Sequence, residues 1–379
     1  MNFLIGVFSI VSAQSVIPLE NVATSFVLNP NPFGPNIEGA SVDAAGTVYA
    51  VDFRDTQFQN PNSAVGSVFP KAGLAFGKQG TKVDTLLNGA RFLKDGSAII
   101  VDAVAHKVYN FKSSSSFTEI CGGAKFLQPN DLAITKSEKY VYFSGQNFTA
   151  TTFPTGQSGD IWLCDRERGI VKNVGLPFYS PMDIHRTNGI EVSPNDQYLY
   201  VSSASNFNGT VLSNQIIQFQ INQENGDLGQ PRVLIDFGML DKTGDVDIDG
   251  MRTDIEGNLY VTRNGAGKVT ILSPTGELKG TIKLPTISNP TNLEFGGTNG
   301  KTLVIVGKCA GNLTSSCINT WESPIAGKAI TYLREGTSRQ VVSTISQNNR
   351  NTPLSATTNK ASSNSILFAN LFWILFMIY

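Results

Sequence analysis

The sequence predicts an all-β fold, a six-bladed β-propeller, and three observations support this prediction. The chain has 379 residues, of which 36 are glycine and only 16% are charged, as in proteins dominated by strands and turns. A sequence pattern recurs six times, at intervals of 42 to 61 residues. It consists of a polar residue, an apolar strand, a turn and a second apolar strand. Four short strands in a repeat of this size are typical of a propeller blade.

The six copies alternate apolar and polar residues with period two. They read EGASVDAAGTVYAVD, NGARFLKDGSAIIVD, NDLAITKSEKYVYFSG, NGIEVSPNDQYLYVSS, DGMRTDIEGNLYVTR and NLEFGGTNGKTLVIVG. Turn residues at the middle of each copy indicate a β-hairpin. Further strands such as GKVTILSP follow several copies, and an early strand near VATSFVLNP is expected to complete the last blade. We therefore expect the propeller to span residues 16–336.

Both ends of the chain resemble processing signals. Residues 1–13 have a short apolar run and small residues before a cut, as in a signal peptide, although a buried first strand is an alternative. Residues 337–355 are rich in Ser, Thr and Asn and predict a stalk. Residues 356–379 combine a polar spacer with an apolar tail too short to span a bilayer. With attachment at Ser355, this pattern predicts a lipid (GPI) anchor, and a tail anchor is the alternative.

Charge and cysteine usage narrow the class of protein. Lys plus Arg total 29 and Asp plus Glu total 30, so no basic face for nucleic acid is expected. We expect a monomer at the cell surface or outside the cell, which contacts the membrane only through its anchor. Glycosylation sequons in the sequence agree with that compartment, at Asn147, Asn208 and Asn312.

The four cysteines permit three pairings. The short separation of Cys309 and Cys317 favours a loop clasp, which leaves Cys121 to pair with Cys164.

The first residue of each copy suggests a metal site. If these positions lie at the mouth of the inner strands, six oxygen-bearing side chains converge, from Glu38, Asn88, Asn130, Asn188, Asp249 and Asn292. Hard divalent cations take six to eight oxygens from such groups. The alternative is that Asn and Asp cap the turn into each strand, but a glutamate in that position does not fit turn chemistry.

The stretch DVDIDGMRTDIEG, from Asp245 to Gly257, matches the EF-hand calcium loop. We reject that interpretation because a turn and the strand LYVTR follow where an EF-hand needs a helix. Position eight of the loop is Arg252, whereas an aliphatic residue is required. Only Asp249 of this stretch therefore belongs to the expected ring.

Several of these phrases resemble the gluconolactonase/regucalcin (senescence marker protein) family of six-bladed propellers. They are NGIEVSPNDQYLYV, DGMRTDIEGNLYVTRNGAGKVTILSPTGEL and NPTNLEFGG, and the resemblance covers roughly residues 36–310. It implies that Glu38, Asn188 and Asp249 bind the catalytic divalent metal. It also implies that Asn130, with Asp131 beside it, contacts metal-bound water or the substrate. The ion expected first is Ca²⁺, with Zn²⁺ or Mn²⁺ as alternatives.

The sequence departs from the family at Gln128, where some members carry an arginine that holds a sugar acid. This departure weakens the case for gluconolactone itself. The resulting hypothesis is a lactonase in which the metal activates water and Asp249 serves as base, with a small lactone or related ester as substrate. A phosphotriesterase-like hydrolase and a non-catalytic binding propeller are the alternatives.

Other chemistry has little support in the sequence. The chain has only two histidines, which excludes a three-histidine zinc site. We interpret His185 as a hydrogen-bonding residue of the rim, and a general base is the alternative. Asn88 and Asn292 are further candidates for contacts in the ring. No nucleophile elbow or phosphate-binding glycine loop is found in the sequence.

Overall fold

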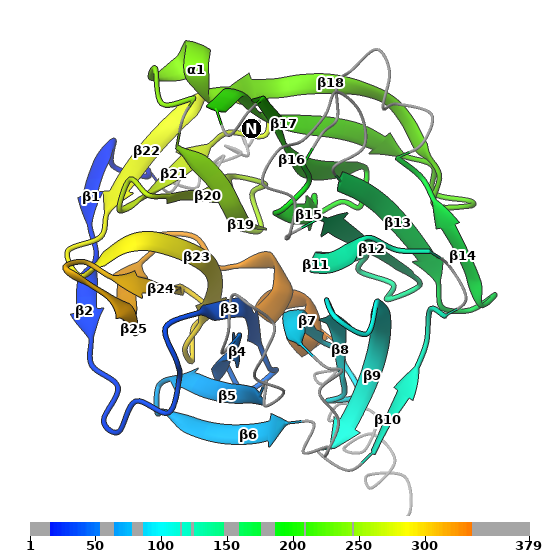
Figure 1. Ribbon diagram of the computed structural model, residues 1–379, viewed down its shortest axis with the longest axis horizontal. Helices are drawn as coiled ribbons and strands as arrows, with labels where there is room; N and C mark the ends of the chain where they lie inside the picture. The colour runs from blue at the N-terminus through cyan, green and yellow to red at the C-terminus, as the bar shows by residue number, and fades with distance from the viewer. Residues whose placement is uncertain are drawn as a thin grey trace, which may run out of the picture. The chain divides into compact units, whose positions relative to one another are not determined.

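The computed structural model describes most of the chain between residues 16 and 335. The described ranges are 16–53, 64–77, 86–113, 116–122, 125–147, 159–175, 186–207, 210–244 and 246–335. Their strands form six sheets around a central axis, so the predicted six-bladed propeller is confirmed (Figure 1).

Each of the first three blades has four antiparallel strands, which follow one another in chain order from the axis outward. Blade 1 contains β3 (Ile37–Val42), β4 (Val48–Asp52), β5 (Ala64–Phe69) and β6 (Gly73–Gly77). Blade 2 contains β7 (Leu87–Phe92), β8 (Ala98–Asp102), β9 (Lys107–Ser113) and β10 (Ser116–Glu119). Blade 3 contains β11 (Gln128–Ile134), β12 (Tyr140–Gln146), β13 (Gly159–Asp165) and β14 (Ile170–Asn173).

The other three blades follow the same plan. Blade 4 contains β15 (Ile190–Val192), β16 (Tyr198–Phe207), β17 (Thr210–Ile221) and β18 (Leu228–Asp236), and the short helix α1 (Phe237–Leu240) follows it. Blade 5 contains β19 (Asp247–Thr253), β20 (Leu259–Asn264), β21 (Lys268–Leu272) and β22 (Leu278–Lys283). Blade 6 contains β23 (Ile287–Gly296), β24 (Thr302–Cys309) and β25 (Asn312–Glu322).

An aspartate at the start of the hairpin turn shapes several blades. In blade 1 the Asp43 carboxylate accepts a hydrogen bond from the backbone N–H of Thr47 at 2.9 Å. In blade 5 the Asp254 carboxylate accepts one from the N–H of Asn258 at 3.0 Å. Such Asx turns explain why the same turn residues recur at the centre of the sequence repeat.

Two strands from the N-terminal region close the ring of blades. β2 (Thr24–Phe26) pairs antiparallel with β25, and thereby completes blade 6 as the sequence predicts. β1 (Glu20–Val22) pairs parallel with β22 and adds a fifth strand to blade 5, which the sequence does not predict. One short segment therefore joins blade 5 to blade 6.

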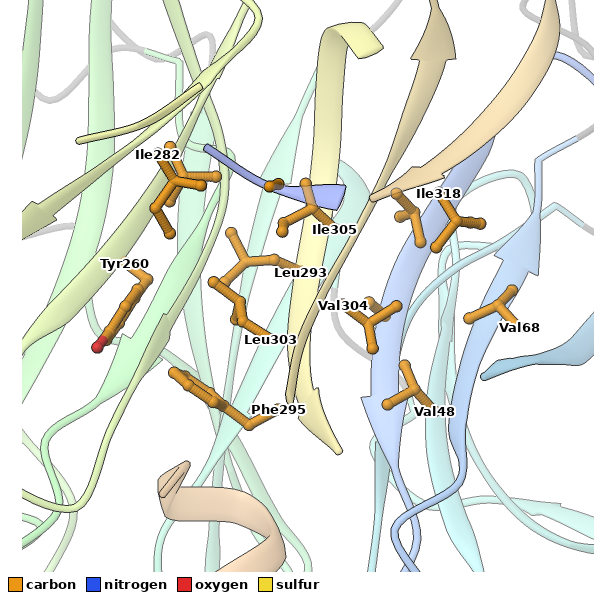
Figure 2. Close-up of a cluster of buried hydrophobic side chains, with 14 of the residues drawn as sticks. Val48, Val68, Tyr260, Ile282, Leu293, Phe295, Leu303, Val304, Ile305 and Ile318 are labelled. Carbon is orange, nitrogen blue, oxygen red and sulfur yellow. The ribbon is translucent and has the colours of Figure 1, made fainter. Parts of the chain in front are cut away.

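Apolar side chains fill the spaces between neighbouring blades. Figure 2 shows the cluster around blade 6, where Tyr260 from blade 5 and Val48 from blade 1 flank Leu293 and Phe295. The rings of Tyr260 and Phe295 meet edge to face, with their centroids 5.0 Å apart. Burial of each large apolar side chain contributes about 1.5–3 kcal/mol to stability, so the blades hold one another in place.

Both expected disulfides are present. Cys121, beyond the end of β10, is bonded to Cys164 on β13 and joins blades 2 and 3. Cys309 and Cys317 clasp the hairpin between β24 and β25.

A helix over residues 328–335 covers the channel at the end where the inner strands finish. The Tyr332 hydroxyl donates a hydrogen bond to the carbonyl of Pro194, on the turn that follows β15. The Arg334 guanidinium donates to the carbonyls of Ala44 at 2.9 Å and Thr298 at 2.9 Å, on the turns after β3 and β23. The helix thus bridges several blades. Neither it nor α1, the helices of the described residues, has the length and apolar character needed to cross a membrane.

Candidate active site at the channel mouth

The six predicted ring residues all lie at the same end of the inner strands. Five of them lie within β3, β7, β11, β19 and β23, and Asn188 lies two residues before β15. In these five strands the pairing register shifts at or beside the ring residue, as between Glu38 and Ser41 or between Ile248 and Met251. Bulges of this kind turn a side chain out of the regular pleat. The recurring bulge therefore explains how these five strands can direct polar side chains to one place.

Glycine follows the ring residue in four blades, at Gly39, Gly89, Gly189 and Gly250. A Cβ atom on Gly39 would lie 2.2 Å from the carbonyl oxygen of Asn88. A Cβ atom on Gly189 would lie 2.1 Å from the carbonyl oxygen of Asp249. Only glycine permits this approach, and it brings ring residues of neighbouring blades close together.

Buried hydroxyl groups join two further pairs of blades beside the ring, namely blades 3 and 4 and blades 6 and 1. Thr187 precedes Asn188, and its hydroxyl donates a hydrogen bond to the carbonyl of Gly145 in blade 3 at 2.8 Å. Thr291 precedes Asn292, and its hydroxyl donates to the carbonyl of Ile37 in blade 1. The position before the ring asparagine thus fixes the spacing of the blades at the mouth.

The two acids of the ring are largely shielded from solvent and perturb each other. The pKa of the Glu38 carboxyl is raised well above its usual range, first by burial and then by the charge of Asp249. Burial also raises the pKa of Asp249 to about 7, against the opposing hydrogen bond from Asn264. Neither carboxylate forms an ion pair with a residue in the described ranges. Both acids therefore retain a proton more readily than an ordinary carboxyl group.

The donor set of the ring fits a hard divalent cation. The Asn188 Oδ1 atom is buried and accepts no hydrogen bond from the described part of the chain, which is a costly state for an amide oxygen. A cation would satisfy this oxygen and offset the charges of Glu38 and Asp249. Within the described residues, no three His, Cys, Asp or Glu side chains cluster so as to hold a metal. The mixed set of acids and amides is thus the candidate site.

Below the ring, the channel contains a second group of charges, which we call the floor cluster. It consists of Arg91, Asp131, Glu191, Arg252, Glu294 and Lys328, all of them buried. The Asp131 carboxylate lies 3.3 Å from Arg91 and 3.2 Å from Arg252. Arg252 Nε lies 3.1 Å from the carboxylate of Glu294. The cluster has three acids and three cations, so it is neutral as a whole.

Lys328, from the C-terminal helix, completes the floor cluster. Its ammonium group donates hydrogen bonds to the carboxylate of Glu191 and to the carbonyl of Val192. Arg91 lies 3.9 Å from the same carboxylate. The floor cluster and the helix together occupy this end of the channel, so a ligand would reach the ring from the mouth.

Asp131 belongs to this floor cluster as well as lying next to ring residue Asn130. Burial opposes its ionisation, but Arg91 and Arg252 outweigh that effect and lower its pKa. The Asn292 amide donates to the same carboxylate at 3.4 Å. The backbone N–H of Leu132 also donates to it, at 2.8 Å. Asp131 thus connects the ring to the floor.

The acids of the EF-hand pattern are spread along a hairpin and do not form a loop. Asp247 pairs with Arg186, and Asp249 lies in the ring. Glu256 is exposed on the turn at the far end of β19, and Asp245 lies outside the described residues. Because β19 is extended, residues 249 and 256 cannot share one ion.

The remaining predicted residues have different outcomes. Gln128 begins β11 opposite Gln146, at the mouth. Asn147 and Asn312 are exposed, as glycosylation requires. The other positions lie outside the described residues, namely His185, Asn208, the leader 1–13, the stalk 337–355, Ser355 and the anchor signal 356–379.

Two polar residues at the mouth were not predicted from the sequence. Asn264 ends β20, and its amide donates a hydrogen bond to the Asp249 carboxylate at 2.8 Å. Asn289 on β23 donates in turn to Asn264 at 2.9 Å. The sequence offered one signal for Asn264, a polar residue that recurs at the end of the second strand. Blades 1 and 2 have aspartate there (Asp52 and Asp102), and blade 5 has Asn264.

Comparison with known protein families gives a match over most of the propeller. The sequence model of the SMP-30/gluconolactonase/LRE-like region matches residues 37–307. Among curated proteins, an uncharacterized protein of Sulfolobus acidocaldarius is 32% identical over 124 residues. That alignment spans 32% of this chain and 41% of the relative, which is less than half of its length.

Solved structures with the same fold include three enzymes or binding proteins. A calcium-binding regucalcin of Agrobacterium tumefaciens has a TM-score of 0.62 at 15% identity, and the likeness covers 82% of this chain and 97% of that one. A luciferin-regenerating enzyme has a TM-score of 0.61 at 17% identity, with 81% and 99% covered. A gluconolactonase of Xanthomonas campestris has a TM-score of 0.55 at 17% identity, with 76% and 86% covered. At these identities the likeness establishes the fold.

Proposed function

We propose that this chain, which belongs to the SMP-30/gluconolactonase/LRE-like family, is a hydrolase that opens a lactone ring with the help of a divalent cation. The observation that carries the proposal is the ring itself, in which two largely buried acids and three asparagines lie at one channel mouth, while the side chain of Asn292 hydrogen-bonds to Asp131 and to the backbone of Leu293. Within the described residues, no protein cation is paired to either acid. The gluconolactonase among the structural neighbours supports a cyclic ester as the substrate class.

Glu38, Asn188 and Asp249 are the residues that would hold the cation. Their oxygens suit Ca²⁺, and Mn²⁺ or Zn²⁺ are alternatives that the same donor types accept. When bound at such a site, a divalent cation polarises an ester carbonyl and favours attack by water. The orphaned Asn188 Oδ1 atom is the structural detail that fits this role.

Asp249 is the candidate base. One of its oxygens accepts a hydrogen bond from Asn264, which leaves the other oxygen to take a proton from the attacking water. The water oxygen bonds to the carbonyl carbon, the ring C–O bond breaks, and the proton passes to the released alkoxide. The product is an open-chain hydroxy acid.

Asn88 and Asn130 are the candidate substrate contacts. Both side chains are buried at the ring, and neither forms a side-chain hydrogen bond with the described residues. Their amides can therefore donate to the carbonyl oxygen or hydroxyl groups of a lactone. Gln128, at the rim, has no charge with which to attract a sugar acid, so we expect neutral lactones to be preferred.

A hydrolysis screen tests this proposal. Aliphatic, aromatic and sugar lactones should be assayed after treatment with chelator and again after addition of Ca²⁺, Mn²⁺ or Zn²⁺. We expect lactone turnover that is lost with chelator and restored by one of these ions. Turnover of phosphotriesters in place of lactones would favour the phosphotriesterase alternative. Cation binding without turnover of either class would favour a binding propeller.

We place the protein in the secretory pathway, at the cell surface. Two disulfides within the described fold support an oxidising compartment. Treatment of expressing cells with phosphatidylinositol-specific phospholipase C should release the protein into the medium. Retention on the membrane, while a control GPI protein is released, would reject the lipid anchor.

A further inference from the structure

The carboxylate of Asp249 is held by a chain of neutral side chains that crosses from blade 5 to blade 6. The Asn264 Nδ2 atom donates to Asp249 Oδ2 at 2.8 Å. The Asn289 Nδ2 atom donates to Asn264 Oδ1 at 2.9 Å. The Ser288 hydroxyl donates to Asn289 Oδ1 at 2.8 Å. We call Asn289 and Asn264 the amide relay, and the Ser288 hydroxyl lies beyond its outer end.

With Asp249 ionised, as it would be beside a cation, the amide relay can run in only one direction. An ionised carboxylate only accepts hydrogen bonds, so Asn264 must turn its NH₂ group toward Asp249. Its oxygen then faces Asn289, which must donate, and the oxygen of Asn289 must accept from a hydroxyl. Each amide therefore fixes the orientation of the next.

We infer that Asn264 and Asn289 are positioning residues for Asp249, and that they fix which of its oxygens faces the ring. The inference rests on the proposed function, because it assigns the free oxygen to the cation and to the proton transfer. Without the relay, the carboxylate could turn about its terminal torsion, which is broad for aspartate. Such loss of orientation weakens both cation binding and proton transfer.

The chemistry of the relay suits this purpose. An amide satisfies one oxygen of Asp249 and leaves the negative charge of the group in place. The nearby Asp131 is held by two arginines, which cancel its charge. The neutral donor beside Asp249 thus leaves a negative charge that an external cation can neutralise. The arginines beside Asp131 already neutralise its charge.

Asn289→Asp is the variant that tests the relay. The substitution is nearly isosteric, but a carboxylate at residue 289 cannot donate to Asn264. It would draw the NH₂ group of Asn264 toward itself, so that the amide turns over and presents its oxygen to Asp249. We expect affinity for Ca²⁺ or Mn²⁺, measured by calorimetry, to fall about 10- to 100-fold.

The sign of this effect separates the relay from simple electrostatics. An added negative charge near a cation site, acting alone, would strengthen cation binding. Ser288→Ala is the matched control, since it removes the last donor and leaves the direction of both amides unchanged. It should bind cation nearly as well as the wild type. In an Asn264→Leu background, Asn289→Asp should no longer weaken binding.

Thermal unfolding in chelator should be similar for wild type and Asn289→Asp, which separates a positioning role from damage to the fold. Unchanged or tighter cation binding by Asn289→Asp would overturn the inference, even if the wild type hydrolyses lactones. Weaker cation binding by this variant would support the inference, even if no lactone is hydrolysed. The two proposals therefore fail on different measurements.

Discussion

The acids at the mouth of the channel and those at its floor differ in whether a protein cation lies beside them. At the floor, Asp131, Glu191 and Glu294 each lie beside a cation supplied by the protein, within 3.9 Å or less. At the mouth, Glu38 and Asp249 form no ion pair with the described residues, and the other four ring positions are neutral amides. The mouth acids lie on β3 and β19 and the floor acids on β11, β15 and β23, which are all inner strands of their blades.

This difference separates a structural from a functional use of charge. Two arginines beside Asp131 lower its pKa and stabilise its ionised form, whereas burial still raises the pKa of Glu294 against the opposing charge of Arg252. A pair of shielded acids without a cation is costly when ionised, and the raised pKa of Asp249 reflects that cost. The acids of the mouth therefore lack a neutralising cation among the described residues, whereas the floor cluster is neutral as a whole.

The largest expected effect is on the rate of lactone hydrolysis at the mouth. Asp249→Asn keeps the shape of the side chain but removes a negative charge and the candidate base. We expect kcat/KM for lactone hydrolysis to fall about 10²- to 10⁴-fold. Far-UV circular dichroism and thermal unfolding in chelator should show an intact fold. Near-normal turnover by this variant would remove Asp249 from the mechanism.

The second expected effect is on stability, at the floor. Lys328→Met leaves the buried Glu191 with only the more distant Arg91, so the free energy of unfolding should fall by about 3–5 kcal/mol. Cation affinity at the mouth should stay the same in the folded protein. The control is Lys136→Met, on the turn after β11. It breaks an exposed ion pair with Glu335, which lies on the same C-terminal helix as Lys328, and should cost less than about 1 kcal/mol. Equal losses in chemical denaturation would contradict the role of the floor cluster.

The third effect concerns cation affinity. Glu38→Gln removes one of the two negative charges of the ring, so calorimetry should show about 10- to 100-fold weaker binding of a divalent cation. Glu256→Gln changes an exposed turn residue from the EF-hand pattern and should have little effect. A loss at Glu256 with none at Glu38 would restore the EF-hand interpretation.

The fold and the ring could be predicted because they follow from a local repeat. Each blade carries the same hairpin, and the polar residue that opens it lies at the same end of each inner strand. Asp249 could be separated from Asp247 and Glu256 because the repeat, not the acidic pattern, gives its position. The sequence alone therefore indicated which acids meet.

The floor cluster could not be predicted in this way. Arg91, Glu191 and Arg252 belong to different copies, and their pairing depends on how closely the inner strands approach the axis. Lys328 comes from a segment without the repeat, which we expected to belong to the last blade and which forms a helix. Asn264 was missed because its aligned positions, Asp52 and Asp102, accept hydrogen bonds from backbone N–H groups instead.

The smallest effect is a dependence of stability on pH in the absence of a cation. Between its ordinary pKa of 3.8 and about 7, folded Asp249 holds a proton that the unfolded carboxyl has released. The folded state therefore binds more protons in this window, and the free energy of unfolding should fall as pH rises through it. Melting curves in chelator should show a lower Tm at about pH 8 than at about pH 5, and Asp249→Asn should reduce the difference. Added divalent cation should raise the Tm most at the higher pH, where it competes with the fewest protons. A chelated wild-type protein whose Tm rises across this window would show that the acids of the mouth are already neutralised, as those of the floor are.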